Sequence, residues 1–158
     1  MRRLVPVRLV TAVALVVTGS VAAGAFTSPA SAATPKTTCA VVSISVKGSG
    51  TLSKCTGASY TGGSGKLVVN IKKSPYPATV TWNKTGTTTA SLKYGGLPKG
   101  AKNVCPAGTS EIVVTGTVTG GTGKAVKSIP KGSKVSGNLC YKVSTSSLSL
   151  APKNVLTI

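Results

Sequence analysis

The sequence predicts an all-β fold: an antiparallel β-sandwich or closed barrel of about nine or ten short strands, held by disulfides. Apolar residues recur at every second position in several segments, which is the period of a half-buried strand. No segment of residues 33–158 shows the period of a helix. Clusters of Gly, Pro, Ser, Thr and Asn separate the segments at short intervals, as turns between strands do.

The first half of this domain is predicted to hold five strands. They span residues 39–46, 51–55, 66–72, 78–83 and 87–94. Trp82 alternates with Val80, so we expect it to fill the core as the largest side chain. The apolar residues expected on the core face are Val42, Ile44, Val46, Leu67, Val69, Ile71, Val80, Trp82, Ala90, Leu92 and Tyr94.

The second half is expected to be organised around a long strand that begins at Ser110. A turn at Gly120–Gly123, a short strand up to Ile129 and a turn at residues 130–133 should follow it. Three further strands, at residues 134–145, 148–150 and 155–158, complete the prediction. The residues expected on the core face are Ile112, Val114, Gly116, Val118, Val135, Leu139, Tyr141 and Val143.

Residues 1–32 have the features of a secretory signal peptide. Three arginines precede an apolar run at residues 9–17, and Ala30-Ser31-Ala32 is a typical cleavage site. The run is too short to cross a bilayer as a helix, which takes roughly 20 residues. We therefore expect cleavage near Ala32, a secreted protein with no transmembrane segment, and one all-β domain over residues 33–158.

The four cysteines are expected to form two disulfides, because an even number in an exported chain is typical of disulfide-bonded domains. Among the three possible pairings we favour Cys39–Cys55 and Cys105–Cys140, each within one half of the domain. One observation counts against the first pair. If Gly48-Ser49-Gly50 is a tight hairpin turn, Cys39 and Cys55 are not opposite each other, and a bond would need a bulge.

The composition excludes several classes of enzyme and cofactor site. The chain has no His and no Asp, and Glu111 is its one acidic residue. A Ser-His-Asp triad, a pair of catalytic carboxylates and an ordinary calcium site all need residues that are missing. A zinc site would need all four cysteine thiolates, and the spacing of the cysteines does not support one. We therefore expect a protein without enzymatic activity, catalytic residues, metal or cofactor.

Lysines give the domain a strongly positive charge. All three arginines lie in the signal segment, which leaves 16 lysines against Glu111. The candidate contacts for a polyanion are Lys72, Lys73, Lys99, Lys102, Lys124, Lys127, Lys131 and Lys134. The same charge could serve solubility alone. A single dense face of lysines would favour binding, and an even distribution would favour solubility.

Tyr60 and Tyr76 are candidate aromatic contacts, because they lie near prolines and glycines in segments expected to be turns. Together with Trp82 they could form a platform on which sugar rings stack. For Trp82, burial in the core is the favoured alternative.

The CPAGTSE segment at residues 105–111 and the TGTVTGGTG run resemble small secreted proteins of actinomycete bacteria. This resemblance implies a β-rich exported protein without an assigned activity. We expect a binding or cell-surface-associated module attracted to anionic cell-wall polymer, acidic glycan or another polyanion, with no specific nucleic-acid motif. The alternative is a cationic antimicrobial or toxin-like protein that acts on anionic cell envelopes.

Overall fold

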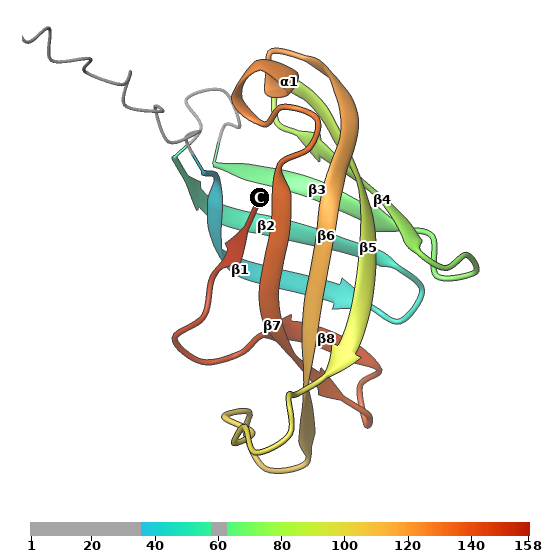
Figure 1. Ribbon diagram of the computed structural model, residues 1–158, viewed down its shortest axis with the longest axis vertical. Coiled ribbons are helices and arrows are strands. Elements are labelled where there is room, and N and C mark those ends of the chain that lie inside the picture. The colour runs from blue at the N-terminus through green and yellow to red at the C-terminus, as the bar shows by residue number, and fades with distance from the viewer. Residues whose placement is uncertain (1–35, 58–62) are drawn as a thin grey trace, which may run out of the picture. The chain divides into compact units, whose positions relative to one another are not determined.

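Eight antiparallel strands close into a barrel in the computed structural model, which describes residues 36–57 and 63–158 (Figure 1). The strands are β1 (Thr38–Ser45), β2 (Ser49–Thr56), β3 (Ser64–Val69), β4 (Tyr76–Trp82), β5 (Gly86–Gly96), β6 (Thr109–Gly123), β7 (Lys134–Lys142), β8 (Ser147–Leu150) and β9 (Leu156–Thr157), and the helix is α1 (Ala125–Ser128). The predicted all-β, disulfide-bonded fold is confirmed, as a closed barrel.

The ring closes because β1 pairs with β2 on one side and with β8 on the other. The short β9 is an additional strand that pairs with both β1 and β7. Strands β1, β2 and β3 pass crosswise behind β5, β6 and β7 (Figure 1). The longest strand is β6, which pairs with β5 and β7 along most of its length.

The inward face of the strands supplies one continuous core. Its residues include Val42, Ile44, Leu52, Leu67, Val69, Val80, Trp82, Leu92, Val114, Val118, Val135 and Leu139. Trp82 is 2% exposed, and its Nε1 donates a hydrogen bond to the Thr88 hydroxyl at 2.8 Å. This bond satisfies the indole N–H inside the barrel, as burial of a tryptophan requires. The prediction that Trp82 fills the core is confirmed.

The side chains nearly fill the barrel. The remaining internal cavity is about 40 Å³ and its walls are apolar residues such as Val42, Leu52 and Leu139. An eight-stranded barrel is just wide enough to be filled by its own side chains or to hold one small ligand. Pockets for drug-sized ligands measure roughly 300 to 1,000 Å³. A binding site of that size must therefore lie on the outside of this barrel or at its ends.

Both disulfides follow the predicted pairing. The Cα atoms of Cys39 and Cys55 are 3.9 Å apart, and those of Cys105 and Cys140 are 5.6 Å apart. The hairpin does not turn at Gly48-Ser49-Gly50, the position that would have offset the first pair, but at residues 46–48, and β2 begins at Ser49. In this register Cys39 lies directly opposite Cys55, and no bulge is needed.

Two local predictions around β6 are wrong. Gly120–Gly123 does not turn but continues β6 to Gly123, paired with residues 86–89 of β5. At Gly121 a Cβ atom would collide with the Thr87 carbonyl oxygen, so a residue without a side chain suits this close pairing. The segment after Lys124 is a single helical turn, α1, and not a strand. Ala125 and Ile129, four residues apart, are both buried, which is the spacing of one helix face.

Candidate functional site

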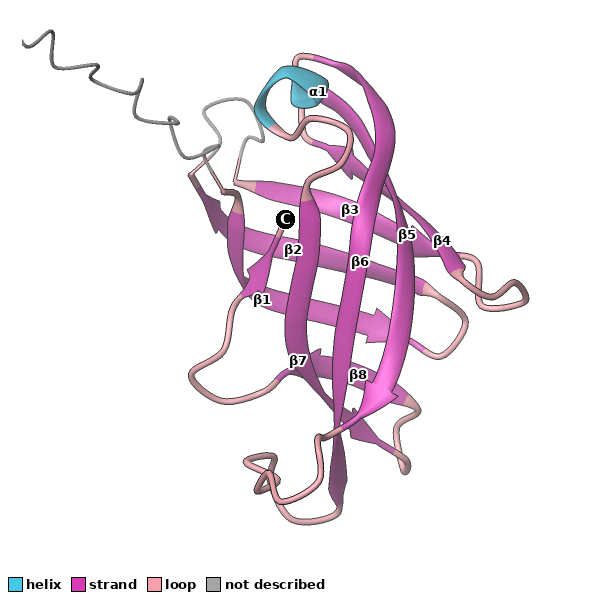
Figure 2. Ribbon diagram, in the orientation of Figure 1, coloured by secondary structure: helices cyan, strands magenta, loops and turns pink. Residues whose placement is uncertain are grey.

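Three turns lie at the ends of β1, β3 and β7 (Figure 2). Backbone hydrogen bonds connect them. The turns are residues 46–48, 70–75 and 143–146, and we call them the three-turn edge. The Val46 N–H donates to the Ser146 carbonyl at 2.9 Å, and the Val69 N–H donates to the Gly48 carbonyl at 2.7 Å. Gly48 has a φ of 85° and lies against the Val69 carbonyl, so a side chain there would be both strained and blocked.

A groove of about 270 Å³ lies within this edge, and three tyrosines line it. Tyr76 begins β4, while Tyr94 and Tyr141 are among the last residues of strands β5 and β7. The ring centroids of Tyr76 and Tyr94 are 4.8 Å apart, with the rings tilted by 40°. Ile71 and Leu148 complete the apolar wall. The groove therefore offers aromatic surface at the mouth of the barrel, where a ligand can reach it.

The partial burial of Tyr94 affects its hydroxyl. Desolvation raises the pKa of Tyr94 above its ordinary value of 10.0, and the neighbouring Tyr76 raises it further. The Tyr94 phenol consequently stays protonated at neutral pH. It can donate a hydrogen bond as well as accept one.

Lysines lie on two of the three turns and at the end of the strand that leads into the third. Lys47 lies between Val46 and Gly48 in the first turn, Lys72 and Lys73 lie in the second, and Lys142 precedes the third. All four are exposed. The backbone N–H of Lys72 donates to the Asn70 side chain at 3.1 Å, which helps to shape the second turn. The structure thus brings Tyr76, Lys72 and Lys73 of the predicted contacts to one place.

Three aliphatic residues of this edge are exposed, although the alternating pattern predicted that they face the core. The exposed fractions are 41% for Val46, 48% for Ile71 and 66% for Val143. The prediction was wrong because β1, β3 and β7 end at Ser45, Val69 and Lys142. Beyond those ends the alternation of the sequence no longer has a sheet to follow.

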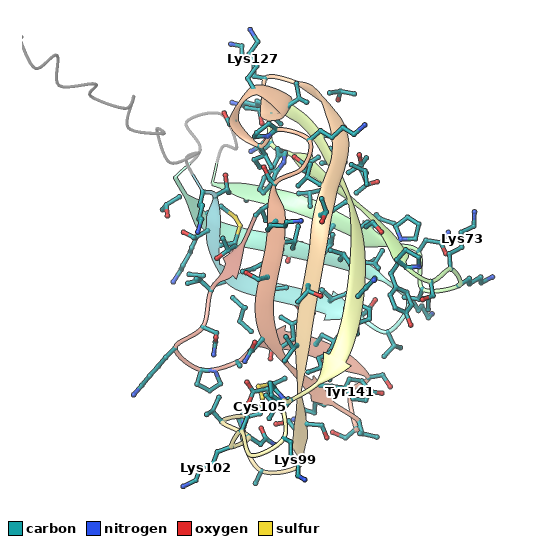
Figure 3. All side chains as sticks on the ribbon, in the orientation of Figure 1. Lys73, Lys99, Lys102, Cys105, Lys127 and Tyr141 are labelled. Carbon is teal, nitrogen blue, oxygen red and sulfur yellow. A yellow bond between two sulfur atoms is a disulfide. The ribbon has the colours of Figure 1, made fainter. Side chains whose placement is uncertain are left out.

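The other predicted lysine contacts lie elsewhere. Figure 3 shows Lys99 and Lys102 on the loop between β5 and β6, far from Lys73, and Lys127 on α1 at the opposite end of the view. Lys124 and Lys131 flank α1 in the sequence, and Lys134 begins β7. The eight lysines therefore do not share one dense face, so their distribution alone does not favour binding over solubility. Tyr60 lies outside the described residues.

Glu111 holds the loop between β5 and β6 against the barrel. It is 8% exposed and accepts hydrogen bonds from the Val104 N–H at 2.9 Å and from the Asn138 side chain at 2.7 Å. The Cys105–Cys140 bond ties the same loop to β7. The one carboxylate side chain of the protein is thus committed to positioning a loop, which gives it a structural role.

The sequence analysis missed Tyr94 and Tyr141 as parts of a site. Both were predicted to face the core, and both are half-buried, but of the two only Tyr94 packs against the core residues. Their position in the last residues of two strands was the available signal, because such residues line the mouth of a closed barrel.

Comparison of the chain with protein-family models, curated proteins and solved structures finds no match. Within residues 36–57 and 63–158, no helix has the length and apolar character needed to cross a membrane.

Proposed function

We propose that this protein is an exported binding module that attaches to an anionic cell-surface polymer through the three-turn edge. The observation that carries the proposal is the tyrosine-lined groove, whose neighbouring turns bear Lys47, Lys72 and Lys73. Lys142 ends β7, next to the third turn. Aromatic rings offer a large, rigid apolar surface, and tyrosine adds a hydroxyl that can hydrogen-bond. Lysines around them attract negative groups as point charges. This combination suits a polymer that carries both sugar rings and anionic groups.

Export supports this reading of the site. The N-terminal segment has a basic start, a short apolar run and an Ala-Ser-Ala cleavage site. Two disulfides are compatible with an oxidising compartment. N-terminal sequencing of the protein from culture medium should find a chain that begins near residue 33, and a cell-bound species that retains Arg2 would contradict export.

The binding test compares a cell-wall polymer rich in phosphate or carboxylate with heparin and DNA across about 50 to 200 mM salt. Four lysine contacts predict a loss of affinity of roughly 50- to 150-fold over this range, because each contact releases counterions. Lys72→Gln with Lys73→Gln should reduce the log–log salt slope by about 1.4 to 1.8. The control, Lys127→Gln with Lys131→Gln, removes the same charge beside α1 and should leave most of the slope.

The tyrosines are tested separately with Tyr76→Leu, which keeps the apolar volume of the groove and removes the ring. Binding that persists at 150 mM salt should weaken about tenfold, which lies at the low end of the roughly 1 to 3 kcal/mol that an aromatic ring contributes when a nucleic-acid base stacks on it. Weak binding to all three polymers, lost by 150 mM salt and equally reduced by both lysine pairs, would mean that the charge serves only solubility.

The second candidate function is a cationic protein that acts on anionic cell envelopes. The exposed Val46, Ile71 and Val143 favour it, because each lies directly beside a lysine at the same edge. Proteins that attach to membranes usually insert apolar side chains into the membrane–water interface and bind anionic lipid headgroups through lysines. Dye release from anionic vesicles and killing of intact cells would identify this activity, whereas a binding module attaches without harm.

A further inference from the structure

A hollow of about 360 Å³ lies on the outer wall of the barrel, across β5, β6 and β7. It shares no residue with the tyrosine-lined groove. Ser91, Lys93, Thr115, Thr117 and Lys134 surround it, and the backbone of Gly116 forms its centre. These five side chains alternate with inward residues such as Leu92 and Val135, so all of them point outward.

The strand register arranges these residues in two rows. Ser91 lies opposite Thr117, which lies opposite Lys134, and this gives the first row. In the second row Lys93 lies opposite Thr115, which lies opposite Ser136. The lysines therefore occupy diagonal corners, with their Cα atoms about 12 Å apart by ordinary sheet spacings. Their long, flexible side chains can both reach the space above the two threonines.

The hydroxyl groups of the hollow differ from those further along the same wall. There, the Thr119 hydroxyl donates to that of Thr89 at 3.2 Å, and the hydroxyls of Thr87 and Thr122 lie 2.9 Å apart. Within the described ranges, the hydroxyls of Ser91, Thr115 and Thr117 have no such protein partner. They are free to bind a ligand.

The charge of the hollow is not balanced by an acidic side chain. Glu111 is four residues before Thr115 on β6, and its carboxylate is occupied by the Val104 N–H and the Asn138 side chain. Two ammonium groups and three hydroxyls can together donate hydrogen bonds to an ion with several oxygen acceptors. Two positive charges match the charge of a dianion.

We infer that this hollow is a binding site for a tetrahedral oxyanion, a phosphate or sulfate group, held by Lys93 and Lys134 with the hydroxyls of Ser91, Thr115 and Thr117. The group is free in solution or carried on a polymer. The site is separate from the three-turn edge, so it stands whether or not that edge binds a polymer.

The test follows the backbone amide resonances of residues 115–117 during titration with inorganic phosphate, sulfate or chloride at constant ionic strength. We expect saturable shifts with phosphate, with sulfate or with both, and none with chloride. Lys93→Gln with Lys134→Gln should weaken binding about tenfold. The matched control, Lys66→Gln with Lys127→Gln, removes the same charge at two other exposed positions and should leave the affinity unchanged.

A second variant distinguishes specific binding in the hollow from non-specific electrostatic attraction to the lysines. Thr115→Val with Thr117→Val keeps the charge and the preference for strand but removes two donors, and it should weaken binding about fivefold. An unchanged affinity in this variant, shifts that do not saturate, or equal shifts with chloride would overturn the proposal. Lys72→Gln with Lys73→Gln should not alter this titration, which distinguishes failure here from failure of polymer binding. Titration with polyphosphate and heparin then shows whether the group is recognised on a polymer.

Discussion

Strands β4 and β7 both extend between the α1 end of the barrel and the three-turn edge. Apolar side chains are buried at the first of these ends and exposed at the second. At one end, the turn at residues 83–85 is joined to the α1 segment by a hydrogen bond from the Ala125 N–H to the Thr85 carbonyl. Ala125 and Ile129 of that segment are buried in the core. At the other end, the three-turn edge leaves Ile71 about half exposed and surrounds the tyrosine-lined groove. Lysines border both ends.

This difference shows that lysine density alone does not locate a binding site in this protein. The α1 end has Lys84, Lys124 and Lys131 in its turns and Lys127 in the helix, while its apolar residues complete the core. The three-turn edge has a similar charge but keeps aromatic and aliphatic surface accessible. Burial at one end indicates a structural closure, and exposure at the other indicates contact with a partner.

The largest expected effect comes from the same substitution made at both ends. Ile129 is 1% exposed and Ile71 is 48% exposed. Ile129→Ala should lower the free energy of unfolding by about 3 kcal/mol, because it leaves a cavity in the core. Ile71→Ala should change it by no more than about 0.5 kcal/mol. Guanidinium denaturation measures both, and equal losses would contradict the distinction between a closed and an open end.

The next effect concerns the loop between β5 and β6, which Glu111 fastens. Glu111→Ala should lower the free energy of unfolding by about 2 kcal/mol, because the Asn138 amide and the Val104 N–H lose a charged acceptor in two part-buried hydrogen bonds. Glu111→Gln should cost less, since the amide of Asn138 can turn and accept a hydrogen bond. Denaturation gives the energies, and hydrogen exchange at residues 103–105 should show the loosened loop.

Measuring the affinity of Glu111→Ala for the polymer tests whether the loop between β5 and β6 belongs to the binding surface. The three turns are bonded to one another and not through this loop, so affinity for the polymer should be retained. A loss of affinity in a folded variant would place the loop, with Lys99 and Lys102, within the binding surface.

The smallest effect is the pH dependence caused by Tyr94. Folding raises the pKa of this phenol above 10.0, so the folded protein holds the proton more tightly than the unfolded chain. This stabilisation is fully present below the unfolded pKa and is lost as pH rises through the folded pKa. Stability should therefore fall more steeply above about pH 10 in the wild type than in Tyr94→Phe. Parallel curves from denaturation between pH 8 and 11 would show that Tyr94 is no more buried than an exposed tyrosine.

The strands and the disulfides were predictable because period-two alternation assigns each residue to a face of the sheet. Val42, Leu67 and Val114, for example, were predicted to face the core and do so. The pairing of Cys39 with Cys55 also follows from local sequence separation, although the register that places them opposite depends on where the first hairpin turns.

The groove was not predictable, because alternation gives the face of a residue but not its height along the barrel. Tyr94 and Tyr141 share the inward face with Leu92 and Leu139, yet they lie at the mouth and not in the middle. The strand ends that decide this are set by the turns. Gly120–Gly123 was equally ambiguous, because glycine is common in turns and also allows the close strand pairing seen here.

The backbone of Thr37 exchanges two hydrogen bonds with that of Ile158, at 3.0 and 2.8 Å. The start and the end of the barrel therefore lie side by side, and β1 separates them from the three-turn edge by about 25 Å, the length of eight strand residues. A carrier fused at either point, such as a bead, a fluorescent protein or a display scaffold, would be attached away from that edge. Immobilisation through such a tag would present the tyrosine-lined groove to the solution. On a sensor surface made in this way, the three-turn edge would stay accessible to a ligand.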